Sequence, residues 1–158
     1  MIYNEQNLDG WAIPREAFEW IYNNLPHGST ILELGSGNGT KELVKRYNVY
    51  SVEDDEKWVG LEPKSNYIYA PLVNDWYDTK ILFNKLPKKY DLLIIDGPIR
   101  EKRVNFIKHY TKFKTDIPII IDDTHRERDK GLCEFLSKHL NKKIINIQST
   151  KKMCSVLI

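Results

Sequence analysis

A glycine-rich turn is the most specific chemical signal in the sequence. Residues 33–39 read ELGSGNG, between a short apolar run and a helical pattern. Alternating glycines let the backbone turn sharply and let a ligand approach the main chain without meeting a Cβ atom. The dinucleotide pattern GxGxxG fails here, because Thr40 occupies its third glycine position. A second pattern, an acidic residue followed by alternating glycines, fits in full at Glu33, Gly35, Gly37 and Gly39.

Acidic residues follow the second apolar run of the chain. Glu53 is expected at the C-terminal end of a strand, where a carboxylate can accept hydrogen bonds from both hydroxyls of a ribose. Asp54 and Asp55 come next, and either could cap a short helix. The order of a glycine-rich turn and then an acidic strand end indicates a nucleoside-containing cofactor.

Three more carboxylates stand at the ends of later strands. Asp96 ends the fourth apolar run, and Asp122 with Asp123 ends the fifth. Ligands of doubly wound sheets bind outside the carboxyl ends of the strands, and neighbouring strands lie about 5 Å apart, so these carboxylates could share one ion. Oxygen ligands suit Mg²⁺ or another divalent cation. Alternatively, Asp96 and Asp122 orient loops and Asp123 or Thr124 caps the last helix.

The elements that position these residues alternate between strands and helices. The fourth and fifth apolar runs are apolar at successive positions, as in central strands of a parallel sheet covered by helices on both faces. The expected parallel strands are 30–34, 48–53, 66–70, 91–96 and 118–122. The expected helices are 14–25, 41–47, 75–85, 101–113 and 126–140. This alternation predicts an α/β fold with a doubly wound sheet.

The end of the chain departs from that alternation. Two further apolar runs, 144–148 and 153–158, are separated by a turn too short to hold a crossover helix. Strands joined so tightly must run antiparallel. We therefore expect a mostly parallel sheet of seven strands with an antiparallel last strand and helices on both faces.

The glycine turn, the acidic second strand and the closing hairpin together resemble the class I S-adenosylmethionine-dependent methyltransferases, which are Rossmann-like. The resemblance covers nearly the whole chain and implies the strand order 3-2-1-4-5-7-6. It implies S-adenosylmethionine as cofactor, with its ammonium near Glu33, directly or through water. Leu72 would pack on the adenine, and Asn74 or Asp75 could reach the adenine amino group. The implied cofactor-binding residues are Glu33, Gly35, Ser36, Gly37, Gly39, Glu53, Asp54, Leu72 and Asp96.

The strand-end carboxylates are similar to those of metal-dependent O-methyltransferases, such as the catechol type. That likeness implies Asp96, Asp122 and Asp123 as metal ligands and an oxygen of a small-molecule or glycan acceptor as the methyl acceptor. The catechol type carries a lysine three residues after the first Asp, where this chain has Ile99. His125 is therefore the candidate base, beside Asp96 as the second catalytic residue. A surface loop histidine is the alternative interpretation of His125.

Arginines near the same strand ends suggest a further contact to the acceptor. Arg100, Arg103 and Arg126 are expected at the rim of the cleft and could hold an anionic group. Solvated helix residues are the alternative for all three.

Length and composition set the remaining expectations. The 158 residues are expected to form a single domain, 1–158, in which residues 1–12 are a short N-terminal segment and a possible lid. Within it, Trp11 could close the cleft or pack on the first helix. The net charge of +2 makes a nucleic-acid partner unlikely, and the sequence shows no signal peptide and no membrane-spanning run. A cytoplasmic protein and a possible homodimer are expected.

Two other classes of function remain open at this point. A NAD-dependent oxidoreductase shares the strand–turn–helix arrangement, but Thr40 and the closing hairpin count against it. A non-catalytic methyltransferase-like binding protein would keep the fold without the reaction. The intact glycine pattern counts against that second class.

Overall fold

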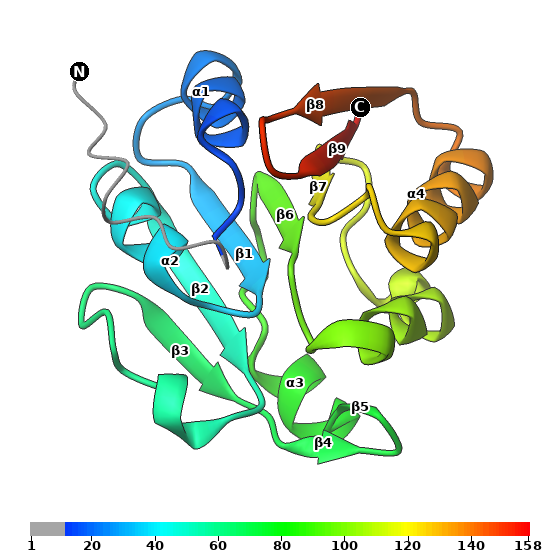
Figure 1. Ribbon diagram of the computed structural model, residues 1–158. Helices are drawn as coiled ribbons and strands as arrows, with labels where there is room; N and C mark the ends of the chain where they lie inside the picture. The colour runs from blue at the N-terminus through cyan, green and yellow to red at the C-terminus, as the bar shows by residue number, and fades with distance from the viewer. Residues whose placement is uncertain (1–11) are drawn as a thin grey trace.

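The computed structural model describes residues 12–158, and its centre is a seven-stranded sheet (Figure 1). The strand order is β3-β2-β1-β6-β7-β9-β8. Because β4 and β5 form a separate hairpin, β6 to β9 are the fourth to seventh strands of this sheet, and the order confirms the predicted 3-2-1-4-5-7-6. All pairs are parallel except those that β9 makes with β7 and β8. The strands are β1 Thr30–Leu34, β2 Asn48–Glu53, β3 Asn66–Tyr69, β6 Leu92–Ile95, β7 Ile119–Ile121, β8 Ile144–Gln148 and β9 Met153–Leu157.

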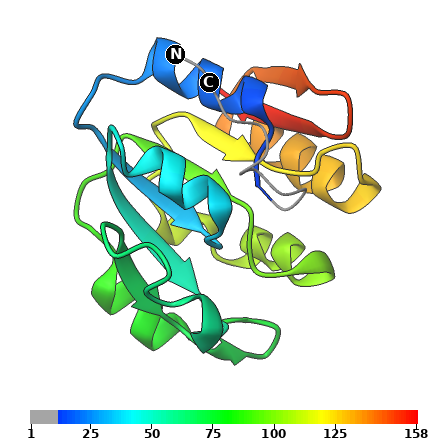
Figure 2. The same cartoon turned by 60° about the vertical axis from the view of Figure 1, so that its left-hand side comes forward.

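Helices cover both faces of this sheet (Figure 2). Helices α1 (Arg15–Asn24) and α2 (Asn38–Leu43) lie on one face. On the other face lie α3 (Thr79–Lys85), the 3₁₀ helices η3 (Arg100–Lys108) and η4 (Tyr110–Lys112), and α4 (Glu127–Leu140). A further 3₁₀ turn, η2 (Glu56–Trp58), follows β2.

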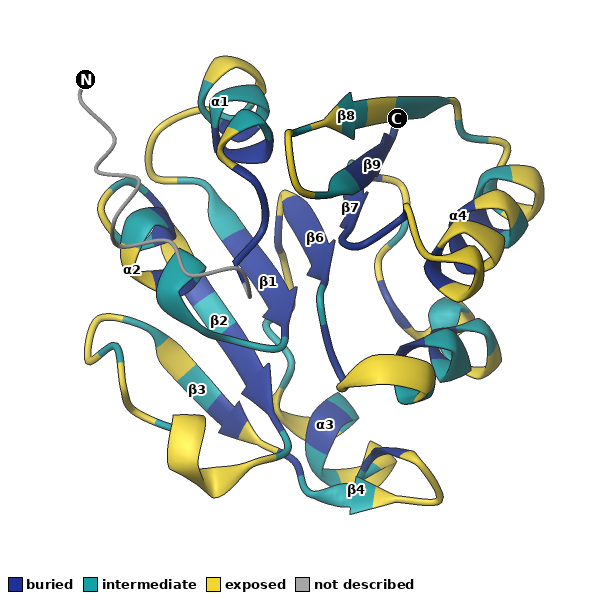
Figure 3. Ribbon diagram, in the orientation of Figure 1, coloured by how far each residue is buried: buried dark blue, intermediate teal, exposed yellow. Residues whose placement is uncertain are grey.

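The two helical layers explain the unbroken apolar runs of the central strands. Along β6, Leu92 and Ile94 belong to the core beneath α1 and α2, whereas Leu93 and Ile95 belong to the core beneath α3 and α4. Because successive side chains of a strand point to opposite faces, both sets must be apolar. Strands β1, β6, β7 and β9 are accordingly buried over most of their length (Figure 3).

The helix expected over 75–85 is shorter than predicted. Its first residues belong to a small hairpin of β4 (Leu72–Val73) and β5 (Trp76–Tyr77). Asn74 and Asp75 form its turn with φ angles of 52° and 62°. Two-residue hairpin turns require such positive φ values, and Asn and Asp adopt them more readily than most residues. The turn preference of Asn74 and Asp75 therefore outweighs the helical pattern, and α3 begins only at Thr79.

The segment expected as a helix over 101–113 is helical but wound as 3₁₀. In η3 the buried residues are Arg103 and Phe106, three positions apart. A 3₁₀ helix has three residues per turn, so these two side chains point the same way, into the protein. The expected helix 41–47 is likewise displaced, because α2 begins at Asn38, directly after the glycine turn.

The predicted lid falls almost wholly outside the described residues. Of the segment 1–12, only Ala12 is described; it is buried, and nothing follows for Trp11. Within residues 12–158, no helix is both long and apolar enough to cross a membrane.

Candidate functional site

The glycine turn begins with a direct contact between two backbones. Gly35 has φ +86°, a conformation that side chains disfavour, and a Cβ atom there would lie 3.0 Å from the Gly97 nitrogen. A Cβ atom on Gly97 would lie 2.5 Å from the Tyr77 hydroxyl and 3.0 Å from the Cα atom of Gly35. The ends of β1 and β6 can approach this closely only because both positions are glycine.

The next two glycines have different surroundings. A Cβ atom on Gly37 would meet nothing within 4 Å, so its main chain is open to solvent and to ligands. A Cβ atom on Gly39 would lie 3.2 Å from the ring of Phe18, so Gly39 lets α2 approach α1. Among the three glycines of the turn, only Gly37 therefore keeps space free for a bound molecule with respect to residues 12–158.

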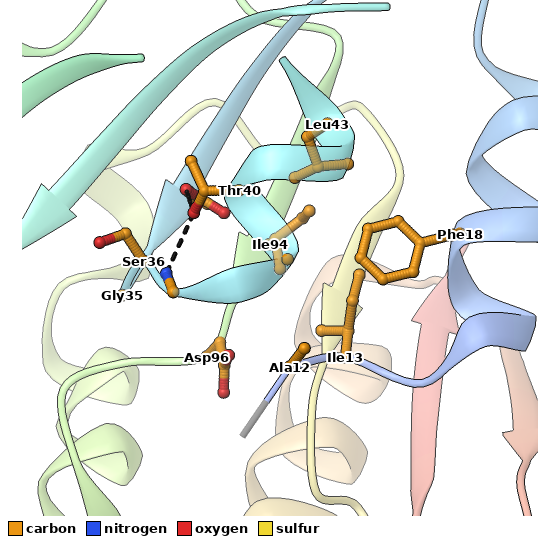
Figure 4. Close-up of a pocket in the computed structure, with 12 residues that line it drawn as sticks. Ala12, Ile13, Phe18, Gly35, Ser36, Thr40, Leu43, Ile94 and Asp96 are labelled. Atoms are coloured by element: carbon orange, nitrogen blue, oxygen red, sulfur yellow. Dashed lines mark hydrogen bonds between the residues drawn. The ribbon is translucent and has the colours of Figure 1, made fainter. Parts of the chain in front are cut away.

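Thr40 holds the open turn in shape. Its hydroxyl accepts a hydrogen bond from the Gly37 N–H at 3.1 Å and donates one to Glu33 Oε1 at 2.6 Å (Figure 4). A glycine at this position, as in the dinucleotide pattern, could make neither bond. Thr40 thus connects the turn to the acidic residue of the preceding strand.

Glu33 is buried under the turn. Its Oε1 also accepts a hydrogen bond from the Ser51 hydroxyl at 2.6 Å. Burial raises the pKa of Glu33 to about 7, although the bonds from Ser51 and Thr40 act in the opposite direction. Glu33 and Asp96 both line a cavity of about 20 Å³ beneath the turn. That volume is enough for about one water molecule.

Glu53 reaches the same turn from β2. Its Oε1 accepts hydrogen bonds from the Ser36 N–H at 2.5 Å and the Ser36 hydroxyl at 2.6 Å. Burial raises the pKa of Glu53, and the two Ser36 bonds lower it. Burial also raises the pKa of Asp54. Asp55 is the helix cap, because its side chain accepts a hydrogen bond from Lys57 N at the start of η2.

A larger cavity of about 230 Å³ extends from the glycine turn to the ends of β6 and β7. Five of the predicted site residues do not line it: Glu33 and Gly39 line the smaller cavity, and Asp122, which is buried, Leu72 and His125 line neither. Leu72 packs against the core from β4, and His125 accepts a hydrogen bond on Nδ1 from the Met153 N–H at 3.3 Å. The predicted site residues that line the cavity are Gly35, Ser36, Gly37, Glu53, Asp54, Asp96 and Asp123.

The three strand-end carboxylates converge as predicted. Asp96, Asp122 and Asp123 each offer an oxygen atom, and these atoms lie within 4.8 Å of one another. Asp122 is fully buried, and its Oδ1 has no hydrogen-bond partner among the described residues. The fold therefore brings the proposed metal ligands together.

Basic side chains of the chain already pair with these carboxylates. Lys152 Nζ lies 2.5 Å from Asp122 Oδ2 and 3.7 Å from Asp123 Oδ1. Arg126 lies 3.1 Å from Asp123 Oδ2. Each of these ammonium and guanidinium groups supplies positive charge that a bound cation would otherwise supply.

Arg103 provides the largest share of that pairing. Its guanidinium contacts Asp96 Oδ1 at 3.2 Å, Asp123 Oδ2 at 3.5 Å and Asp129 Oδ1 of α4 at 3.2 Å. It also donates to the main-chain oxygen of Asp96 at 2.6 Å. Burial lowers the pKa of Arg103, but the surrounding aspartates, Asp96 foremost, raise it above its ordinary value. Arg103 lines the larger cavity, yet it is a buried clamp and only 4% exposed.

The same burial acts on the acids. Burial raises the pKa of Asp96 well above its ordinary value, and the neighbouring Asp122 raises it further. Burial raises the pKa of Asp122 as well, while Lys152 lowers it. Asp96, whose side chain is 23% exposed, lines both cavities, so it is an acid with a raised pKa that faces the cleft.

Sequence reasoning missed Lys152 as a site residue. A signal for it was present, because the antiparallel β9 begins beside the end of β7, where Ile121 pairs with Ser155. The residue just before β9 must then lie near Asp122.

Solved structures with the same fold include several methyltransferases. An O-methyltransferase from Bacillus cereus in complex with SAH superposes with a TM-score of 0.65 and 16% identity, over 98% of this chain and 86% of that one. An O-methyltransferase from Streptomyces achromogenes, involved in tomaymycin synthesis and in complex with SAM, superposes with a TM-score of 0.63 and 13% identity. That superposition covers 98% of this chain and 84% of the other. The C-terminal domain of precorrin-6Y C5,15-methyltransferase from Rhodobacter capsulatus superposes with a TM-score of 0.61 and 13% identity, over 96% of this chain and 91% of that domain.

These likenesses show the fold: the chain has the Rossmann-like fold of the class I S-adenosylmethionine-dependent methyltransferases. No family model matches the sequence, and no curated protein matches it either. Conservation of the fold at such low identity means that the site must be judged from its own residues.

Replacing Gly35 and Gly37 separately should distinguish close packing from an open ligand site. We expect Gly35→Ala to lower the free energy of unfolding by about 2–4 kcal/mol, because its Cβ meets the Gly97 backbone at a positive φ angle. Gly37→Ala should change it by less than about 0.5 kcal/mol. Urea unfolding of both variants measures the difference, and equal losses would contradict this account of the turn.

Glu33 should make stability depend on pH in a defined direction. Its pKa is about 7 in the folded chain against 4.5 for an ordinary glutamate, so the folded state loses relative stability as pH rises from 4.5 through 7. Glu33→Gln removes that cost and should stabilise the protein by about 2–3 kcal/mol at pH 8 and hardly at all at pH 4. Denaturant unfolding at both pH values is the measurement. Glu134→Gln, on the exposed side of α4, is the control, and a gain of equal size at both pH values would refute the burial effect.

Removing the Arg103 guanidinium should cost about 3–5 kcal/mol of unfolding free energy. Arg103→Met keeps most of the buried stem but leaves Asp96, Asp123 and Asp129 without their shared partner. Arg100→Ala, at an exposed neighbouring position, should cost less than about 0.5 kcal/mol. Thermal and urea unfolding compare the two, and a mild effect of Arg103→Met would show that the aspartates do not depend on it.

Proposed function

We propose that this protein is an S-adenosylmethionine-dependent methyltransferase of the EC 2.1.1 group. The observation that carries the proposal is the open main chain at Gly37, in a cavity that Glu53 and Asp96 also line. Two acidic residues from β1 and β2 bond to this same turn, through Thr40 and Ser36. The cofactors in the solved structures of the same fold, SAM and SAH, support the choice of ligand.

The cofactor would occupy the cavity along the turn. Its ribose hydroxyls would bond to Glu53, which uses only Oε1 for Ser36. Asp54 lies beside it and stays a predicted cofactor contact. The ammonium of the methionine part would face Glu33 through the single water that the small cavity can hold. Leu72 as the adenine contact stays a prediction and would require the β4–β5 hairpin to lie against the bound cofactor.

An oxygen atom of a small-molecule or glycan acceptor is the methyl acceptor that we propose. The acceptor oxygen attacks the methyl carbon, an O–C bond forms, the C–S bond breaks, and its electron pair leaves on sulfur as a neutral thioether. The hydroxyl proton would pass to a carboxylate, and the position of Asp96 in the cavity lining supports its assignment to that role, because burial raises its pKa and so favours the uptake of a proton. His125, the base predicted from the sequence, does not line this cavity, and its role stays an untested alternative to Asp96. Positioning of the two reactants supplies much of the acceleration.

The sequence predicts a divalent ion at Asp96, Asp122 and Asp123, and the contacts of these residues count against it. Their spacing suits a shared cation, but Lys152 already bonds to Asp122, and Arg103 with Arg126 bonds to Asp123. A divalent ion would have to lie next to a buried ammonium group. The donor set with Lys152 in place therefore does not fit a metal ion, and no step of the reaction is assigned to one.

An anionic group on the acceptor is a further part of the proposal. Arg100 and Arg126 are exposed, and both line the larger cavity. Guanidinium groups bind carboxylates and phosphates through paired hydrogen bonds. The net charge of only +2 favours a small molecule with such a group over nucleic acid. The single domain, the cytoplasmic location and the homodimer stay predictions.

Calorimetric titration tests the cofactor. We expect SAM and SAH to bind and NAD not to bind, because Thr40 replaces the third glycine of the dinucleotide turn. Gly37→Ala and Glu53→Gln should each weaken SAH binding by about tenfold or more, the first by filling ligand space and the second by removing a charged acceptor. Glu56→Gln, exposed on η2, is the control. Binding of NAD alone would refute the proposal and favour an oxidoreductase.

A further inference from the structure

Lys152 is held over the end of β7 by an ordered turn. The turn between β8 and β9 is closed by a hydrogen bond from the Ser149 N–H to the Lys152 carbonyl at 2.9 Å. The Ser149 hydroxyl donates to the same carbonyl at 2.8 Å, and the Lys152 N–H donates back to that hydroxyl at 3.1 Å. These bonds fix the main chain from which the lysine side chain extends.

The ammonium group of Lys152 lies among the strand-end carboxylates. Its side chain is 10% exposed, and its Nζ is 2.5 Å from Asp122 Oδ2, an atom of a residue with no exposed surface. Asp123 Oδ1 is 3.7 Å away on the same side. A buried carboxylate requires a positive partner, and Lys152 is the nearest one to Asp122.

The same group also borders the space left for the acceptor. Lys152 lines the 230 Å³ cavity together with Asp96 and with Ser36 and Gly37 of the glycine turn. An ammonium group has three N–H donors, and one of them is used by Asp122. A donor therefore remains for an oxygen atom in the cavity.

We propose that Lys152 is the resident cation of the Asp96–Asp122–Asp123 cluster: it excludes a divalent ion and binds the acceptor oxygen in its place. An ammonium hydrogen bond stabilises negative charge that develops on that oxygen as it loses its proton and attacks the methyl group. The second half of the inference rests on the proposed methyltransferase function, whereas the exclusion of a metal does not. The expected consequence is methyl transfer that a chelator leaves unchanged.

Titration with Mn²⁺ tests whether Lys152 excludes a divalent ion. Binding is measured as the loss of the electron paramagnetic resonance signal of free Mn²⁺. Wild-type protein should bind Mn²⁺ weakly. Lys152→Met keeps the stem but removes the charge, and it should bind Mn²⁺ at least about tenfold more tightly. Adding Asp122→Asn to that variant should abolish the gain. Lys151→Met, at the exposed neighbouring position of the same turn, and Lys152→Arg, which keeps the charge, should both behave as wild type.

Two results would overturn the inference. The first is tight binding of Mn²⁺ by the wild-type protein, with loss of that binding in Asp122→Asn. This result can be obtained even if no Lys152 variant folds. The other is a folded Lys152→Met that binds Mn²⁺ no better than wild type. SAH calorimetry on the same samples separates the proposals, because absent SAH binding would refute the methyltransferase while leaving the Mn²⁺ result intact.

Discussion

Charge compensation by Arg103 is the interaction on which the cleft end of the sheet depends. Parallel strands bring their carboxyl ends to one edge, and here that edge carries Asp96 after β6 and Asp123 after β7. Asp129 adds a third carboxylate from α4. A single buried guanidinium contacts all three, so η3, α4 and two strands are joined through one side chain. Without such pairing, burial of these acids would be strongly unfavourable.

Close backbone contact between the ends of β1 and β6 has the complementary role. Gly35 and Gly97 touch, which draws the glycine turn toward the carboxylate edge. Hydrogen bonds from the Thr40 hydroxyl to Glu33 and from the Ser36 hydroxyl to Glu53 hold the turn in place. Its shape therefore does not depend on a ligand. The main chain at Gly37 is left open. A preformed, open turn of this kind binds a ligand without first having to become ordered.

The cleft is divided into two chemical halves. The half near β2 is acidic, with Glu53 and Asp54, and suits the hydroxyls of a ribose. The half near β7 carries the positive groups Arg126 and Lys152 against buried aspartates. Structures with this fold differ in acceptor while sharing the sheet, and the B. cereus and R. capsulatus proteins illustrate that range. Under the proposed function, the second half is where the acceptor would be recognised.

Local sequence determined most of the fold. The successive apolar positions of β6 and β7 required helices on both faces, and the short connection before β9 required an antiparallel pair. The glycine turn was also determined locally, because the spacing of glycines within one segment defines its shape. Sequence periodicity misplaced the start of α3 and the winding of η3, since a two-residue turn at Asn74–Asp75 and the burial of Arg103 prevailed.

The partners of the carboxylates were decided only by the tertiary structure. Asp96, Asp122 and Asp123 were predicted to converge, and they do, because parallel strands end at a common edge. Whether a metal ion or a side chain compensates their charge depends on residues far away in the chain, Arg103 and Lys152. Such long-range pairs leave no periodic signal in the sequence. They follow from the antiparallel course of β9 and from the burial that makes an unpaired carboxylate costly.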